Sequence, residues 1–371
     1  MTTRMRHQGI LRLAIRQSAV RFGRMSGESQ QDFAYAFLSI LFEGAPFILL
    51  GTLISGFIDI YMPPGMMDRF LPKNKTLAVI VAGLMGAIFP VCECAVVPVI
   101  RRLVRKGLPV SCALTYMLAA PIVNPITALS TWKAFSGPMV MWQGETVSAQ
   151  WLMTSGRLGL GLVVAILLGL VVARMPMVWI LRKRLVDEIN GVSTASKKKA
   201  SKKQHVHTAE CSHQGCGHDH SHEHDSSAGS SRLVAAFRSA IKDFVDVGVY
   251  FSIGVVITAL FNTGIAPGAA WLDGLASRDV IAPAALMVLA FILSLCSTSD
   301  AFIAATLDKF TYGAKLAFLV FGPMLDLKLI FLYQTVMRRK FIFWMALGLF
   351  VSIGAAAVAF QWVINQSSNL P

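Results

Sequence analysis

Long apolar stretches limit this chain to a membrane fold more firmly than any other feature. A helix that crosses a bilayer needs about 20 mainly apolar residues. Only 15% of the residues are charged, whereas a soluble domain carries about 25%. No alternating pattern typical of a membrane barrel is present, so the spans are predicted to be helices. They lie at 33–58, 152–174, 244–261, 281–296, 314–336 and 341–363.

Two further apolar segments are interrupted by proline, which removes a backbone donor and breaks a regular helix. Segment 76–106 contains Pro90 and Pro98, and segment 108–135 contains Pro121 and Pro125. Each segment is either one broken crossing or a re-entrant hairpin. The predicted fold is therefore an all-α polytopic membrane protein with about eight transmembrane helices, some of them broken or re-entrant.

The net charge of +14 does not indicate a nucleic-acid partner. The basic residues gather in short loops beside the apolar spans, which is the pattern of cytoplasmic loops in membrane proteins. Residues 1–32 form a basic leader with six arginines before residue 25. It lacks the apolar core of a signal peptide. We expect it in the cytoplasm, either as an amphipathic helix on the membrane or as a solvated segment.

The polar stretch 182–232 separates the two membrane regions. It is rich in Lys, Ser and His and lacks apolar periodicity, as a linker does. Its positive charge predicts a cytoplasmic position. Imidazole and thiol groups bind Zn and Cu, so the loop is either an adaptable metal binder or only a soluble spacer. Its candidate ligands are His205, His207, Cys211, His213, Cys216, His218, His220, His222 and His224.

Matching features on either side of this loop predict an internal duplication. Glu43 and Asp246 are 203 residues apart, as are Gly51 and Gly254. A similar spacing relates "CECA" at 92–95 to "STSDA" from Ser297, and Asn124 to Asp326. We therefore expect a first repeat plus an extra helix at 33–181 and a second repeat at 233–371. Duplicated halves with broken helices are common in secondary transporters, which bind substrate where the halves meet. Whether the repeats are parallel or inverted is left open.

The stretch Cys92-Glu93-Cys94 lies between two prolines, so we expect it to be unwound. A carboxylate at membrane depth is costly unless it is paired or hydrated, which makes Glu93 a functional candidate. Thiolates are soft ligands suited to Cu(I), Zn(II) and similar thiophilic ions. Buried cysteines also occur as small apolar residues, and Cys112 is interpreted in this way.

The corresponding stretch of the second half supplies Cys296, Ser299 and Asp300. If the halves meet there, Cys92, Cys94 and Cys296 can form a three-thiolate site for Cu(I) or a trivalent arsenical, or for Zn(II) with a further ligand. Other polar residues predicted to relay protons or bind ions inside the membrane are Glu43, Asn124, Asp246 and Asp326. The alternative is that Lys315 and Lys328 form ion pairs with some of these acids, which would then have only a structural role.

Motifs of other protein classes are missing. The chain has no phosphate-binding loop of an ATPase, no D-K-T-G motif of a phosphorylated pump, and no H-E-x-x-H motif. The sequence therefore predicts a transporter and not an enzyme, with no cofactor of its own. A membrane redox enzyme or a metal sensor, built on the same cysteines, is the alternative of another class.

Four motifs stand out along the chain, namely "PVCECAVVPVIRRL", "LAAPIVNPITALSTWKAF", "CSTSDAFIAATL" and "GPMLDLK". Together they resemble the predicted-permease family that includes bacterial organoarsenical efflux permeases. The His-rich loop resembles the branch named copper/zinc efflux transporters. The resemblance covers roughly residues 33–136 and 240–340 and implies a multi-pass permease of the bacterial inner membrane that exports toxic metals or metalloids. The matching motif positions are Cys92, Glu93, Cys94, Pro121, Asn124, Pro125, Ser299, Asp300, Pro323 and Asp326.

The leading hypothesis is a secondary transporter that exports Zn or Cu from the cytoplasm. The runner-up is efflux of trivalent arsenicals or another thiophilic solute. Besides the lipid membrane and the metal or metalloid, a homo-oligomer and a soluble metal donor are partners that the sequence leaves open.

Overall fold

The computed structural model describes residues 27–62, 71–88, 92–142, 145–183, 185–187, 189, 228–265 and 280–368. Within these ranges, five helical spans are long and apolar enough to cross a membrane. Four coincide with single helices, and the fifth, Tyr312–Tyr333, combines two helices. The single helices are α2 (Gly27–Tyr61), α8 (Ala149–Val172), α11 (Ala228–Ile265) and α17 (Arg339–Ser368), and the pair is α15 (Tyr312–Met324) and α16 (Leu327–Tyr333).

Three shorter apolar helices accompany them, namely α4 (Lys75–Ile88), α6 (Val110–Ala119) and α13 (Ile281–Leu293). The other helices are α5 (Glu93–Arg105), α7 (Pro125–Ala134), α9 (Met177–Ile180) and α14 (Ser299–Thr306). A two-stranded antiparallel hairpin, β1 (Met139–Trp142) and β2 (Glu145–Ser148), precedes α8, with Met139 opposite Ser148. The predicted all-α membrane class is confirmed. Of about eight predicted crossings, five are long enough in the described residues, and the segment at 281–296 forms only the short helix α13.

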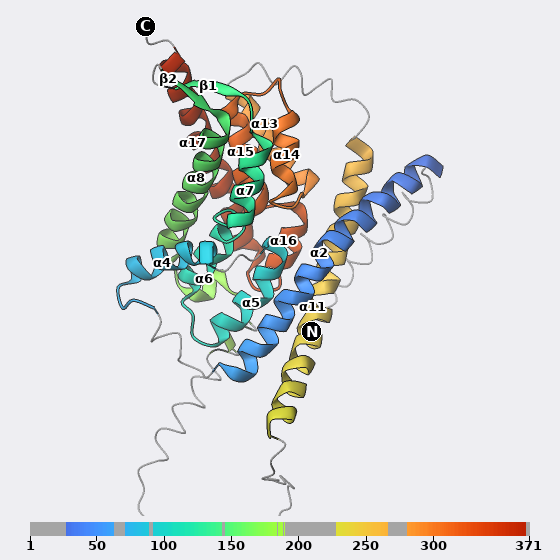
Figure 1. Ribbon diagram of the computed structural model, residues 1–371. Coiled ribbons are helices and arrows are strands. Elements are labelled where there is room, and N and C mark those ends of the chain that lie inside the picture. The colour runs from blue at the N-terminus through green and yellow to red at the C-terminus, as the bar shows by residue number, and fades with distance from the viewer. Residues whose placement is uncertain are drawn as a thin grey trace, which may run out of the picture.

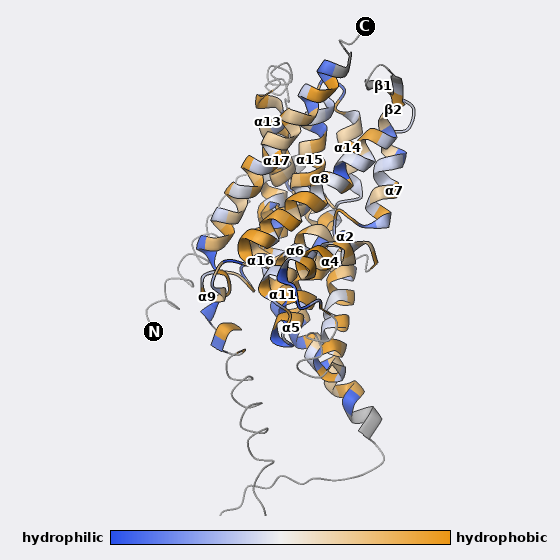
Figure 2. Cartoon of the chain, turned by 90° about the vertical axis from the view of Figure 1, so that its left-hand side faces the viewer, coloured by the Kyte–Doolittle hydropathy of each residue, from blue (hydrophilic) through white to orange (hydrophobic). Residues whose placement is uncertain are grey.

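The helices form two groups. In one, α2 and α11 lie side by side along one edge of the molecule (Figure 1), where α5 packs on α2 and α16 on α11. In the other, α4, α6 and α8 pack together, as do α13, α15 and α17, and α8 contacts both α15 and α17. Figure 2 shows mainly apolar ribbon along the packed helices and hydrophilic residues near α5 and α9.

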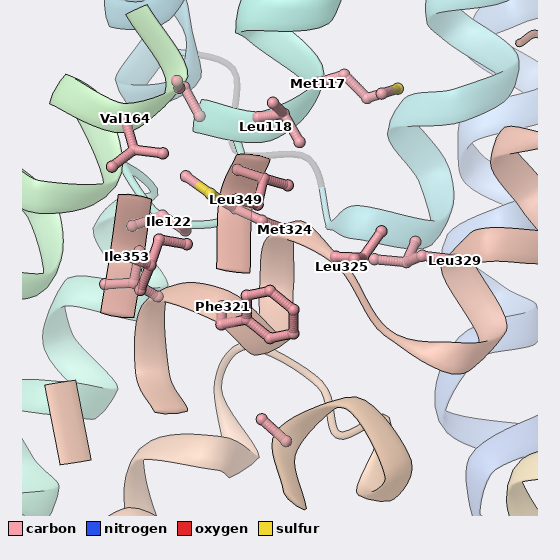
Figure 3. Close-up of a cluster of buried hydrophobic side chains, with 14 of the residues drawn as sticks. Met117, Leu118, Ile122, Val164, Phe321, Met324, Leu325, Leu329, Leu349 and Ile353 are labelled. Carbon is pink, nitrogen blue, oxygen red and sulfur yellow. The ribbon is translucent and has the colours of Figure 1, made fainter. Parts of the chain in front are cut away.

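The interior of the second group is apolar. Figure 3 shows one cluster of buried apolar side chains that includes Met117, Leu118, Ile122, Val164, Phe321, Met324 and Leu349. Each of these side chains is at most 5% exposed. The core therefore holds α6, α8, α15 and α17 together beside the helix breaks that carry the polar residues.

Both interrupted segments are broken helices. The first changes from α4 to α5 between Ile88 and Glu93, and the second from α6 to α7 between Ala119 and Pro125. One prediction is wrong here, because Pro98 does not end the unwound stretch but lies inside α5. Glu93 and Cys94 are therefore in the first turn of a helix, where no preceding turn exists to accept their N–H groups.

Glycine 51 brings α2 and α5 into backbone contact. A Cβ atom added to Gly51 would lie 2.5 Å from the carbonyl oxygen of Ala95 and 2.9 Å from its Cα. Both of these Ala95 atoms belong to the backbone, so the contacts cannot be relieved by a rotamer change.

We expect Gly51→Ala to force α2 away from α5 and to destabilise the protein by about 1–3 kcal/mol, as overpacking does. Thermal unfolding of the purified protein in detergent measures this. Gly248→Ala on α11 is the matched control, because an added Cβ there meets no atom within 4 Å. Equal unfolding midpoints for the two variants would contradict the close α2–α5 contact.

Candidate functional site

A narrow cleft brings together residues that are far apart in the sequence. Its free volume for a water-sized sphere is about 10 Å³, which is room for about one water molecule. Three cysteines and two glutamates line it, and they come from α2, from the start of α5 and from the break before α14. The lining residues are Ile40, Glu43, Gly44, Phe47, Cys92, Glu93, Cys94, Phe251, Cys296 and Lys328.

The three sulfurs differ in exposure. Cys92 is the N-cap residue of α5, and Cys94 lies in its first turn, with 4% of its surface exposed. Cys296 lies between α13 and α14, and its Sγ accepts a hydrogen bond from Thr298 Oγ1 at 3.6 Å. Cys92 and Cys296 are half-buried. Within the described residues, no three His, Cys, Asp or Glu side chains are placed to hold one metal ion in this conformation.

Glu93 is buried at the cleft, where its carboxylate contacts a lysine and a serine. Its Oε1 is 3.5 Å from Lys328 Nζ, and its Oε2 accepts a hydrogen bond from Ser297 Oγ at 3.4 Å. Lys328 Nζ also lies 3.4 Å from Asp326 Oδ2 and donates to the carbonyl of Ser294 at 2.8 Å. One buried ammonium group thus serves two buried carboxylates and one backbone carbonyl.

A second buried pair lies behind Ser297. Arg157 of α8 is 1% exposed, and its Nη2 donates to Asp300 Oδ2 at 2.7 Å and to the carbonyl of Ser297 at 2.9 Å. Its Nη1 donates to Thr131 Oγ1 at 2.9 Å. Arg157 Nε and Asp300 Oδ1 are buried without a hydrogen-bond partner. An intramembrane charge pair of this kind avoids the large cost of a lone buried charge.

Helix N-termini help to accommodate the acids. Glu93 and Asp300 lie in the first turns of α5 and α14. Asp326 caps α16 by accepting a hydrogen bond from Leu329 N at 2.6 Å, and Asn124 caps α7 through Ile126 N at 2.9 Å. Unpaired N–H groups make a helix N-terminus favourable for negative charge. The breaks in the helices therefore place polar residues where the backbone stabilises them.

The structure places the predicted path residues in three settings. Cys92, Glu93, Cys94, Cys296 and Glu43 line the cleft, and exposed Glu43 accepts a hydrogen bond from Ser299 Oγ at 3.2 Å. Asp300 and Asp326 lie behind it, within the two pairs described above. Asn124 and Asp246 are not among the cleft residues.

Asp246 has a different neighbour. Its side chain is 53% exposed and lies 3.8 Å from Arg101 on α5. Asp246 and the cleft residue Phe251 are both on α11 but five residues apart. At about 100° per residue this is one full turn plus about 140°, so the two side chains leave the helix on different faces. The matching spacing to Glu43 in the sequence therefore does not translate into a matching position at the cleft.

The far end of α5 carries a separate ion network. Arg102 lies 2.8 Å from Asp59 of α2 and 2.8 Å from Asp243 of α11. Ser55 Oγ also donates to Asp243 at 2.9 Å, and Ser239 Oγ donates to Asp59 at 3.0 Å. This network ties α5 to both long helices, away from the cleft lining.

Sequence reasoning did not single out Arg157, Arg102, Asp59 or Asp243. Arg157 had a usable signal, since it is the one charged residue within the apolar helix Ala149–Val172. Neutralisation of the acids by Lys328 was the alternative to a functional role for them, and Lys328 does lie beside two of them. Lys315 donates instead to the carbonyl of Ala305 at 3.4 Å and lies over the rings of Phe135 and Tyr312.

Cys112 lies away from the cleft. Cys112 is buried in a small apolar cluster with Ala78, Val79 and Ala82, as expected for a packing residue. Cys211, Cys216 and the seven histidines of the polar loop lie outside the described residues, so their role stays a prediction.

Comparison with known proteins points to transport. The model of a family described as "Predicted permease" (ArsP_1) matches residues 30–362. The UPF0718 protein YcgR of Bacillus subtilis is 34% identical over 310 residues, which cover 83% of this chain and 89% of that protein. A putative two-component membrane permease complex subunit of Streptococcus mutans is 31% identical over 307 residues, or 82% of this chain and 87% of that protein. No solved structure matches the chain significantly.

Proposed function

This chain belongs to the ArsP_1 family of predicted permeases, and from that premise we propose that it exports thiophilic metal ions, foremost Zn or Cu, from the cytoplasm. The observation that carries the proposal is the cleft shared by Cys92, Cys94, Cys296, Glu43 and Glu93. Three soft sulfur donors and two carboxylates that face one space are suited to a cation that must leave its hydration shell.

The charges at the cleft favour a cation over a neutral solute. Glu43 and Glu93 face it with two carboxylates, and Lys328 faces it with one ammonium group. In their ionised forms these side chains leave one negative charge uncompensated. A metal ion entering between them would neutralise this charge, whereas a neutral arsenical would not.

The ion binds, in our proposal, by replacing water with sulfur. Thiols are mostly protonated near neutral pH, and metal ions bind the thiolate form, so binding releases protons. Because no three ligands are preassembled among the described residues, Cys92, Cys94 and Cys296 must draw closer as the ion enters.

The arrangement of the helices supports alternating access between two related halves. Helices α4, α6 and α8 contact one another, and so do α13, α15 and α17, their counterparts in chain order. Likewise α5 contacts α16 while α14 contacts α7. We propose that these two sets are the repeats predicted from the sequence and that the cleft lies where they meet.

The His-rich loop gives the direction of transport in this proposal. Its positive charge favours the cytoplasmic side, where its imidazoles and thiols can collect Zn or Cu for export through the inner membrane. The relative named as a subunit of a two-component permease complex leads us to propose a second protein component as well. A soluble metal donor or a second copy of this chain would fill that role.

Trivalent arsenicals are the second candidate substrate. They also bind thiols, and the three cleft cysteines could serve as their ligands. A membrane redox enzyme or a metal sensor would use the same cysteines, but neither would move its ligand across the membrane.

A growth test distinguishes these candidates. The chain is expressed in a bacterial host that lacks its own metal and arsenical efflux systems, and growth is compared on Zn, Cu, arsenite and methylarsenite. We expect tolerance to rise for Zn or Cu relative to the empty vector. A gain confined to the arsenicals would transfer the proposal to the second substrate. No gain on any of the four would contradict export altogether.

A further inference from the structure

The segment Ser294–Thr298, which carries Cys296, is held in place by side chains from other helices. It joins α13, which ends at Leu293, to α14, which begins at Ser299. Ser294 has a left-handed backbone with φ of 49°, which is costly for a residue other than glycine. A strained, non-helical segment persists only where its surroundings fix it.

Two buried cations supply this support. Lys328 donates to the carbonyl of Ser294 at 2.8 Å, and Arg157 donates to the carbonyl of Ser297 at 2.9 Å. These two carbonyls are on either side of Cys296. In a continuous helix such carbonyls would accept from the backbone, and at membrane depth water is not there to replace that bond.

Arg157 connects this segment to two other elements. Its guanidinium group contacts the Ser297 carbonyl, the Asp300 carboxylate and the Thr131 hydroxyl. These groups belong to the break, to α14 and to α7. A planar guanidinium group can serve several acceptors in fixed directions, whereas a lysine presents a single nitrogen.

We propose that Arg157 is a positioning residue that sets where the Cys296 sulfur lies in the cleft. It does not line the cleft itself, so it acts through Ser297, the neighbour of Cys296. The inference deepens the proposed function, on which it rests for the role of Cys296, but the position of the sulfur can be measured without any transport.

The test measures the rate at which N-ethylmaleimide labels Cys296 in native membranes. The full-length chain is used, with serine at every other cysteine, that is, at Cys92, Cys94, Cys112, Cys211 and Cys216. Arg157→Lys keeps the positive charge but cannot reach all three acceptors. We expect it to change the labelling rate several-fold, because the segment Ser294–Thr298 loses a fixed anchor.

Arg102→Lys is the matched control. Arg102 is also a buried arginine, and it pairs with Asp59 of α2 and Asp243 of α11, but it lies at the far end of α5 from the cleft. It should lower stability without changing the labelling of Cys296. If Arg157→Lys lowers stability as Arg102→Lys does and leaves the labelling rate at the parent value, Arg157 is only structural and the proposal is overturned.

A milder variant decides the matter if Arg157→Lys does not accumulate. Thr131→Val keeps the side-chain shape and removes the hydroxyl that accepts from Arg157 Nη1 and donates to the Thr127 carbonyl one turn earlier in α7. The proposal expects a smaller change in labelling, in the same direction as for Arg157→Lys where both can be measured. An unchanged rate in Thr131→Val, with Arg157→Lys absent from the membrane, would count against it.

The outcome is separate from that of the proposed function. A shifted labelling rate in a chain that moves no metal would support the positioning role and contradict export. In a chain that transports, Arg157→Lys should raise the metal concentration needed for half-maximal transport, since a displaced ligand weakens binding.

Discussion

Replacing Cys92 and Cys94 together by serine should abolish metal uptake into inverted membrane vesicles. Serine preserves the size of the side chain but replaces a soft sulfur with a hard oxygen, which binds Cu(I) and Zn(II) poorly. Both residues line the cleft, so in the double variant Cys296 is the one cysteine left among the residues that line it. Uptake is measured with Zn and with Cu(I) at matched amounts of protein in the membrane.

The chain offers a matched control for this experiment. Cys112 is buried in an apolar cluster with Ala78, Val79 and Ala82, and Cys112→Ser should leave uptake nearly unchanged. Unimpaired uptake in the Cys92→Ser/Cys94→Ser variant would show that sulfur does not carry the ion. The acids Glu43, Asp300 and Asp326 would then become the leading candidates.

Removing the charge of Lys328 should cause the largest loss of stability. Lys328 is 4% exposed and is placed between Glu93 and Asp326. Lys328→Met would leave both carboxylates buried without their cation. Breaking a buried ion pair by removing one partner costs about 3–5 kcal/mol, so the unfolding midpoint in detergent should fall steeply.

Lys315→Met is the control for this prediction. Lys315 is also a buried lysine, at 7% exposure, but its Nζ donates to a backbone carbonyl and lies over two aromatic rings. Its replacement should cost much less. Lys328→Arg, which keeps the charge, should recover most of the stability. If Lys328→Met is no less stable than Lys315→Met, Lys328 does not stabilise the buried carboxylates of Glu93 and Asp326 as proposed.

The sequence was most informative where chemistry and spacing agreed. Prolines near residues 90 and 121 predicted breaks that the structure has, and the cost of a carboxylate inside a membrane singled out Glu93, which lines the cleft. The correspondence between "CECA" and the stretch from Ser297 led to the expectation that Cys296 lies near Cys92 and Cys94, and all three line one cleft. The signals were prolines, which interrupt a helix, and a carboxylate, which is costly inside a membrane.

Predictions were weaker where the outcome depends on how helices face one another. Pro98 was expected to end the unwound stretch, but its position inside α5 depends on packing that the sequence does not display. Asp246 was paired with Glu43 by spacing, yet it lies beside Arg101. The partners of Arg157 come from α7, from α14 and from the break before α14, and no local pattern links residues 131, 157 and 300.

The most direct test of the central claim is transport by the purified protein. The chain is reconstituted into liposomes that contain a metal-sensitive dye, and Zn or Cu(I) is added outside. We predict saturable uptake by the parent protein, faster than in protein-free liposomes, and none by the Cys92→Ser/Cys94→Ser variant. Uptake by the parent no faster than in protein-free liposomes, for both metals, would contradict the proposal that this permease carries thiophilic metal ions.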